Sequence, residues 1–301
     1  MEAALLSIMT ACVIFISPNC LNAADFIPLK KTFEEFIKGK KAEIGVAVIY
    51  NGTEVLTLNN DSEYPLMSVF KLHQAIAILA KLEQDGLNIS DIVHIEKKDL
   101  LPDTYSPLRD THPEGNLELS IIDLLSYSLQ LSDNNACDIL FDRFISPQGT
   151  DKIIRLFGIE DFSISQTEND MHRNLDNCYR NWSTPLAVAM LIEKTLAGKT
   201  LSPRHTELLK HMLTDCKTGT DRLPKPLPRK VVIGHKTGTG DKNGKQEIIG
   251  LNDAGFVILP DGKRYVIAVL IKNSRLSYEE TSELIAMISG MVYSYIGKFT
   301  S

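Results

Sequence analysis

Metal-binding motifs are missing from this chain of 301 residues. It contains neither a Cys-x-x-Cys pair nor an H-E-x-x-H segment, and its seven histidines are scattered. Cysteine is scarce as well, since Cys12 and Cys20 lie in the first 24 residues and leave only Cys137, Cys178 and Cys216. Three cysteines cannot all pair with one another in one chain. We therefore expect no metal, no cofactor and at least one free thiol, with Cys137 acting as a small buried apolar residue.

Excess positive charge is also missing. The formal net charge is -6, whereas proteins that bind nucleic acids normally carry a basic patch or stripe. The composition, 44% hydrophobic and 23% charged, is that of an ordinary globular protein with room for one large domain or two closely packed ones. We therefore expect no nucleic-acid partner.

An apolar run long enough to cross a membrane is missing, but a shorter one opens the chain. Residues 3–16 are apolar and lead to the small residues Asn22-Ala23-Ala24, an arrangement typical of a secretory signal cut near Ala23 or Ala24. The basic residues that usually begin such a signal are absent, and Ser17-Pro18-Asn19 before Cys20 is a poor match to a lipid-attachment signal. We expect residues 1–24 to be a signal peptide and the mature protein to be periplasmic, without a membrane anchor.

Strand patterns occupy both ends of the remaining chain. Residues 43–50 read E-I-G-V-A-V-I-Y and are followed by Asn51-Gly52 and T-E-V-L-T-L, which predicts a β-hairpin. Three further strands are predicted at 230–238, 250–259 and 264–272, and an amphipathic helix at 278–295.

The middle of the chain has mostly helical periodicity. Helices are predicted at 68–83, 120–129, 136–144, 184–196 and 205–213. This layout indicates a discontinuous α/β domain of residues 25–66 and 216–301, into which an all-helical domain of residues 67–215 is inserted. A cleft between two such domains is a usual place for a ligand.

The segment M-S-V-F-K-L at 67–72 carries a hydroxyl and an amine into an apolar helix. Because Ser68 and Lys71 are three residues apart, a helix places them on one face. Free N–H groups at a helix N-terminus favour developing negative charge, and an adjacent base activates a serine. On this pair alone the alternative is favoured, in which Ser68 caps the helix and Lys71 extends to water.

Two further segments also allow two interpretations. Ser132-Asp133-Asn134 lies between predicted helices and is either a polar capping loop or a loop that presents a hydroxyl and a carboxamide to a cleft. The segment K-T-G-T-G at 236–240 ends a predicted strand and is either a glycine-rich turn or a strand edge that a substrate can approach closely. Alone, each favours the simpler structural interpretation.

Together and in this order, S-x-x-K, S-D-N and K-T-G are the combination found in class A β-lactamases and penicillin-binding proteins. From about residue 26 to 299 the chain resembles a class A serine β-lactamase. The segments P-L-M-S-V-F-K, S-D-N-N-A-C-D-I-L, T-E-N-D-M-H and G-H-K-T-G-T-G-D resemble its Bacteroides-type cephalosporinase branch.

The resemblance implies a serine β-lactamase/D,D-peptidase-like α/β (α+β) fold, an antiparallel sheet flanked by helices plus the inserted helical domain. It also implies a monomer that hydrolyses cephalosporins and penicillins through a serine acyl-enzyme and so gives antibiotic resistance.

The resemblance also implies roles for the motif residues. Ser68 would attack the lactam carbonyl, and the backbone N–H groups of Ser68 and Thr239 would form the oxyanion hole. Ser132 would pass a proton to the ring nitrogen, helped by Lys71 and Lys236. The implied substrate-binding residues are Tyr105, Asn134, Arg222, Lys236, Thr237 and Thr239, with an ordinary surface aromatic as the alternative for Tyr105.

A glutamate on a loop at about 163–183 would hold the water that hydrolyses the acyl-enzyme. Glu168 matches it by order and spacing, and the alternatives are the neighbouring acids Asp170, Glu160 and Asp161. Whether Lys71, or Glu168 acting through water, activates Ser68 stays open.

The chain departs from the family pattern at three places. His172 stands where most members have asparagine, four residues after the loop glutamate, so a changed loop geometry is expected. Ala75 and Leu125 occupy the positions of a disulfide that some members have. Asp241 adds an acid after Gly240.

Two other functions share these motifs. A D,D-peptidase would lack the deacylating glutamate, and a β-lactam sensor would be acylated and stay acylated. Glu168 favours the hydrolase.

Overall fold

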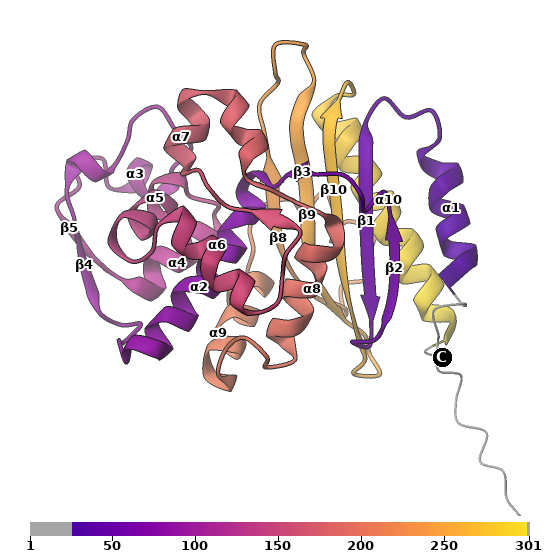
Figure 1. The fold of residues 1–301 in the computed structure, drawn as a ribbon, viewed down its shortest axis with the longest axis horizontal. Coiled ribbons are helices and arrows are strands. Elements are labelled where there is room, and N and C mark those ends of the chain that lie inside the picture. Colours follow the sequence, from indigo (N-terminus) through magenta and orange to yellow (C-terminus); the bar gives the residue numbers. More distant parts are fainter. Residues whose placement is uncertain (1–25, 300–301) are drawn as a thin grey trace, which may run out of the picture.

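A five-stranded antiparallel sheet built from both ends of the chain dominates the computed structural model, which describes residues 26–299. The signal peptide predicted at 1–24 lies outside these residues. The strand order is β2-β1-β10-β9-β8 (Figure 1). The strands are β1 (Glu43–Tyr50), β2 (Glu54–Leu58), β8 (Val232–Thr239), β9 (Ile248–Ile258) and β10 (Arg264–Ser274). The predicted hairpin and the three predicted C-terminal strands are therefore confirmed.

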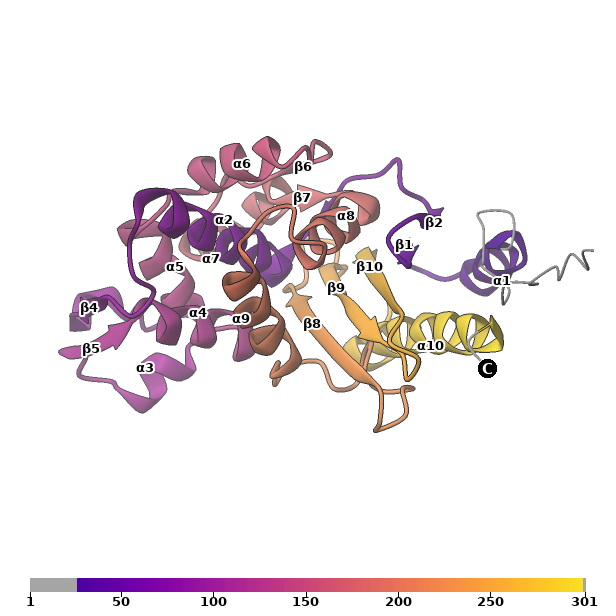
Figure 2. The ribbon, with the colours of Figure 1, turned by 90° about the horizontal axis from the view of Figure 1, so that it is seen from below.

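Helices cover both faces of this sheet. On one face, α1 (Ile27–Ile37) and α10 (Tyr278–Ile296) pack side by side (Figures 1 and 2). On the other, α8 (Pro185–Leu196) packs on β1, β9 and β10, and α9 (Pro203–Thr214) packs on β8. Because both faces are covered, β9 and β10 are buried along most of their length, which explains their nearly continuous apolar sequences.

The remaining helices surround α2 (Phe70–Asp85), which is buried along its first ten residues. They are α3 (Pro107–Thr111), α4 (Ile121–Gln130), α5 (Asn134–Arg143), α6 (Pro147–Leu156) and α7 (Glu168–Arg173), with 3-10 turns at Met67–Val69, Lys97–Asp99, Leu175–Arg180 and Gly297–Phe299. Together with the sheet, these helices confirm the predicted α/β architecture. The domain boundaries at 66/67 and 215/216 stay a prediction.

Short strands also occur in the middle segment, and the helical periodicity did not predict them. One pair is β4 (Ile92–Ile95) with β5 (Leu117–Ser120). A second small sheet joins β3 (Tyr64–Pro65), β7 (Trp182–Ser183) and β6 (Phe162–Ser163). Through β3 and β7, the chain just before Ser68 is paired with the end of the glutamate loop.

Local capping explains where several helices begin. Ser120 and Asp123 form a capping box at α4, and Ser277 and Glu280 form another at α10. Within the described residues, no helix is long and apolar enough to span a bilayer.

Candidate active site

Ser68 lies in the 3-10 turn Met67–Val69 that runs directly into α2. Its side chain caps neither helix, so the capping alternative is wrong. Met67 has a positive φ of 47°, a conformation that L-residues rarely adopt and that is often found at functional sites. The turn is pressed against β8, because a Cβ at Gly238 would lie 2.5 Å from the carbonyl oxygen of Leu66 and 3.3 Å from the nitrogen of Ser68. Only glycine allows this approach.

Lys71 is completely buried, so it does not extend to water. Its Nζ donates to the carbonyl oxygen of Ser132 at 2.7 Å and to Oδ1 of Asn134 at 2.6 Å, and it lies 2.9 Å from Oε1 of Glu168. Nζ of Lys71 therefore joins Ser132, Asn134 and Glu168 and holds them together.

Ser132 joins the two lysines of the site. It has a positive φ of 60°, and its hydroxyl accepts a hydrogen bond from Nζ of Lys236 at 2.9 Å. Asp133 is the cap of α5, since its carboxylate accepts from the backbone N–H of Ala136 at 2.8 Å. Both interpretations of the S-D-N segment are thus partly right: Asp133 caps, while Ser132 and Asn134 face the lysines.

Glu168 is the first residue of α7 and is 8% exposed. The same Oε1 that contacts Lys71 lies 3.2 Å from Oγ of Ser68. Of the alternative acids, Asp170 is occupied in a capping box with Thr167, and Glu160 and Asp161 are exposed. The structure therefore brings only Glu168 of these four acids to Ser68.

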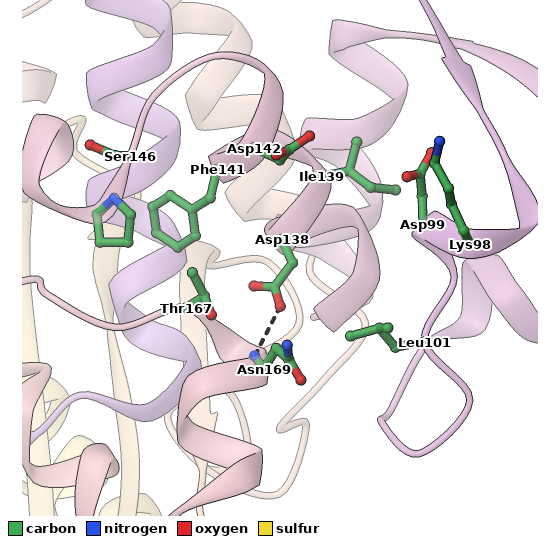
Figure 3. A pocket seen from close by; sticks show the side chains of 11 residues that line it. Lys98, Asp99, Leu101, Asp138, Ile139, Phe141, Asp142, Ser146, Thr167 and Asn169 are labelled. Carbon is green, nitrogen blue, oxygen red and sulfur yellow. Dashed lines mark hydrogen bonds between the residues drawn. The ribbon is translucent and has the colours of Figure 1, made fainter.

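The position of Glu168 depends on Asp138 of α5, a residue that the sequence motifs did not predict. The carboxylate of Asp138 accepts a hydrogen bond from the backbone N–H of Glu168 at 2.8 Å. It accepts a second one from the backbone N–H of Asn169 at 2.9 Å (Figure 3). Burial and the charge of Glu168 raise the pKa of Asp138 to about 7. Behind this contact lies a cavity of about 400 Å³, lined by Asp138 together with Lys98, Phe141 and Thr167 among others. An acid within the apolar run A-C-D-I-L was the only sequence signal for it.

Lys236 and Thr237 are buried in β8, and Thr239 is exposed at its end. Burial and the charge of Lys71 lower the pKa of Lys236 to about 7. Thr237 contacts a second residue that was missed, Thr218, with their Oγ1 atoms 2.5 Å apart. No sequence pattern predicts this contact, because Thr218 lies in the loop after α9 and Thr237 lies in β8.

Arg222 is hydrogen-bonded to the end of β8. It is 7% exposed and donates through Nη1 to the carbonyl oxygens of Gly238 and Asn252, at 3.0 and 2.9 Å. Its Nη2 donates to Oγ1 of Thr239 at 2.5 Å. Arg222 therefore contacts the predicted carboxylate site through Thr239.

The cleft beside Ser68 has a volume of about 90 Å³. Its lining includes Ser68, Asn134, Glu168, Thr239, Asp241 and His172, as well as Met67, Met171, Leu175, Cys178 and Gly240. Tyr105 is 57% exposed, and its backbone carbonyl accepts a hydrogen bond from the N–H of Asn134 at 3.0 Å.

Known proteins share this sequence and fold. The chain matches the model of a family described as the beta-lactamase enzyme family over residues 28–296. A beta-lactamase of Bacteroides uniformis is 37% identical over 274 residues, 91% of this chain and 93% of that protein. The crystal structure of TLA-1 extended-spectrum beta-lactamase has a TM-score of 0.87 and 37% identity, covering 89% of this chain and 98% of that one. A class A beta-lactamase from Bacteroides cellulosilyticus has a TM-score of 0.87 and 33% identity, covering 93% and 100%.

Proposed function

This chain belongs to the beta-lactamase enzyme family and is a class A serine β-lactamase, and we propose that Ser68 is the nucleophile with which it opens the lactam ring. The enzyme hydrolyses β-lactams and thereby gives antibiotic resistance. The observation that carries the residue roles is the shared oxygen of Glu168, which lies within hydrogen-bonding distance of both Ser68 and Lys71.

In acylation, we assign Glu168 as the base. A general base must lie within hydrogen-bonding reach of the proton it removes, and its Oε1 lies 3.2 Å from Oγ of Ser68. Lys71 is the weaker candidate because its Nζ contacts Ser132, Asn134 and Glu168 rather than Oγ of Ser68. As the Ser68 oxygen bonds to the lactam carbon, its proton passes to Glu168.

Collapse of the tetrahedral intermediate breaks the bond between the lactam carbon and the ring nitrogen. The nitrogen takes the hydroxyl proton of Ser132, whose oxygen is held by Lys236 at 2.9 Å. Lys236 then gives a proton to this oxygen, and the proton that Glu168 removed from Ser68 replaces it, so that Glu168 is a carboxylate again. The backbone N–H groups of Ser68 and Thr239 stabilise the oxyanion, a type of interaction whose removal costs about 3–4 kcal/mol in other hydrolases. In deacylation, Glu168 removes a proton from the water that attacks the Ser68 ester. The bond between the acyl carbon and Oγ of Ser68 then breaks, and Glu168 returns the proton to this oxygen.

We further propose that cephalosporins are the preferred substrates and that penicillins are also cleaved. Lys236, Thr237 and Thr239 would bind the substrate carboxylate, with Arg222 acting through its bond to Thr239. Asn134 would bind the side-chain amide of the substrate and Tyr105 would line the entrance of the cleft. The similarity to TLA-1, an extended-spectrum beta-lactamase, supports a broad substrate range.

We also propose that the mature enzyme is a periplasmic monomer, exported through residues 1–24. The absence of a membrane-spanning helix within residues 26–299 is compatible with this location.

The test is turnover of a chromogenic cephalosporin by the purified protein, followed by intact mass spectrometry at steady state. Ser68→Ala should form no covalent adduct. Glu168→Ala removes the deacylating base, so any acylation it supports should end in a persistent adduct, with kcat reduced by about 10²–10⁴-fold.

The same experiment separates the alternative functions. A wild-type protein that forms one equivalent of adduct and then stops would be a sensor or a D,D-peptidase-like enzyme. Normal turnover by Glu168→Ala would remove the role assigned to Glu168 while leaving the hydrolase function intact.

A further inference from the structure

A second group of chemically reactive side chains lies behind strand β8, outside the machinery described above. His235 immediately precedes Lys236 in β8, and successive side chains of a strand point to opposite faces. His235 hydrogen-bonds the carboxylate of Asp253 on β9, with Nδ1 at 2.8 and 3.0 Å from the two oxygens. His235 also interacts electrostatically with the thiol of Cys216, which follows α9. A thiol, an imidazole and a carboxylate thus lie close to one another.

The charges in this group favour a thiolate paired with an imidazolium. Burial opposes ionisation of Cys216, but His235, with the charge of Lys236 and a bond to Thr218, lowers its pKa to about 7. Burial also opposes the charged form of His235, but Asp253 and Cys216 raise its pKa to about 10. Arg222 adds a further buried cation nearby, while Asp215 and Lys217, which flank Cys216 in the chain, are exposed.

The other two described cysteines provide a contrast within the same molecule. Cys137 and Cys178 are buried, whereas Cys216 is partly exposed. Burial raises the pKa of Cys178 to about 12 and that of Cys137 well above its usual value. Reactive cysteines combine partial exposure with an electropositive environment, and only Cys216 of these three has both.

We propose that Cys216 is a second nucleophilic site of this enzyme, a thiolate activated by His235 and Asp253 that forms mixed disulfides with small-molecule disulfides. The Cys216 sulfur attacks one sulfur of the reagent and forms a new S–S bond. The original S–S bond breaks, and the other half of the reagent leaves as a thiolate. No further oxidant or reductant is needed.

The position of Cys216 links this chemistry to the lactam site. Its Sγ lies 3.4 Å from Oγ1 of Thr218, which in turn lies 2.5 Å from Oγ1 of Thr237. A group attached to Cys216 will displace Thr218 and, through it, Thr237. This second step rests on the proposed role of Thr237 in binding the substrate carboxylate, whereas the thiol chemistry does not.

The first experiment measures thiol reactivity alone. The whole protein is mixed with 4,4'-dithiodipyridine, release of the thiopyridone is followed by absorbance, and peptide mapping identifies the modified cysteine. We expect Cys216 to be modified first, with a pH–rate midpoint near 7. The midpoint of the pH–rate profile decides the test, rather than the absolute rate. A thiol of lower pKa is ionised to a greater extent but is a weaker nucleophile, and these two effects on the rate partly cancel.

Matched variants complete the test. His235→Gln should raise the midpoint by about one unit or more, toward the pKa of about 8.5 of an ordinary thiol, and Cys216→Ser should eliminate the fast phase. The proposal is overturned if the wild-type midpoint is that of an ordinary thiol, or if Cys137 or Cys178 reacts as fast.

The link to the lactam site has its own measurement. With the protein modified at Cys216 by oxidised glutathione, we expect KM for a cephalosporin to rise several-fold and to recover when a reductant removes the adduct, with Cys216→Ser unaffected throughout. An unchanged KM in the fully modified protein would overturn the link. The release of thiopyridone is measured without a β-lactam. Its result is therefore independent of whether the residues of the lactam site are correctly assigned.

Discussion

At the scale of single residues, the two lysines of the proposed site, Lys71 and Lys236, are completely buried. Lys236 is completely buried near Lys71, and both burial and that neighbouring charge lower its pKa to about 7. A lysine is charged below its pKa and neutral above it. Binding of a substrate carboxylate by Lys236 should therefore weaken as the pH rises above 7.

The first prediction is an alkaline decline in kcat/KM for cephalosporins, with a midpoint near 7 in the free enzyme. Lys236→Arg should move this decline to higher pH, because arginine keeps its charge throughout the accessible range. Steady-state kinetics between pH 5.5 and about 9.5 measure both profiles. Lys242→Arg, at an exposed position beyond the same strand, is the control and should leave the profile unchanged. If kcat/KM of Lys236→Arg declined at the same pH as that of the wild type, the decline would be caused by the titration of another group.

The sequence predicted the residues that carry motifs but missed those that support them. The motifs S-x-x-K, S-D-N and K-T-G are short, so each can be recognised within one segment of the chain. They single out Ser68, Lys71, Ser132 and Lys236. Asp138 and Thr218 act across elements, 30 residues from Glu168 and 19 from Thr237. No pattern within one segment reports such contacts.

At the scale of elements, α7 depends on its surroundings, because a helix of six residues is not stable alone. Two devices hold it: the capping box of Thr167 and Asp170, and the carboxylate of Asp138 on α5. The helix was not predicted, since its existence depends on these contacts rather than on periodicity. Helices α2, α4, α5, α8, α9 and α10 and the central strands, by contrast, were predicted to within a few residues from their apolar patterns, whereas α6 was not predicted.

The second prediction concerns this attachment. Asp138→Ala leaves two N–H groups without their acceptor, a loss of about 1–2 kcal/mol by analogy with helix caps. The glutamate then loses its fixed position, so deacylation should slow by at least about tenfold and acyl-enzyme should accumulate at steady state. Intact mass spectrometry during turnover measures the accumulated fraction.

The controls for Asp138 come from the same helix. Asp142→Ala, one turn later and exposed, should behave as wild type. Asp138→Asn keeps one oxygen acceptor and should fall between wild type and Asp138→Ala. Equal adduct levels in wild type and Asp138→Ala would mean that the capping box alone positions Glu168.

At the scale of the whole molecule, the sheet separates two apolar cores. One core lies between the sheet and helices α1 and α10, and the other extends from the opposite face through the helices around α2. Sequence alone could not assign residues to these two cores, because strands such as β10 contribute to both. Within the larger core lies His73 of α2, fully buried with its ring centroid 5.6 Å from that of Phe162.

The last prediction is that His73 limits the stability of the whole protein in acid. Burial lowers the pKa of His73 to about 4, and the nearby Val69 backbone and Asp151 only partly oppose this. Because the unfolded chain takes up this proton near pH 6.5 and the folded protein near 4, the free energy of unfolding falls through this window, by about 3 kcal/mol in total. Asp138 has the opposite effect, since its raised pKa favours the folded state as the pH falls below about 7.

Comparing two proteins isolates the histidine from Asp138. His73→Leu keeps a similar volume and removes the titrating ring, while the Asp138 contribution is common to both proteins and cancels. Urea unfolding at a series of pH values from about 7.5 to 4.5 gives the difference in unfolding free energy. We expect this difference to shift in favour of His73→Leu as the pH falls, because only the wild type must keep a buried imidazole neutral. Parallel curves would show that another group controls acid unfolding.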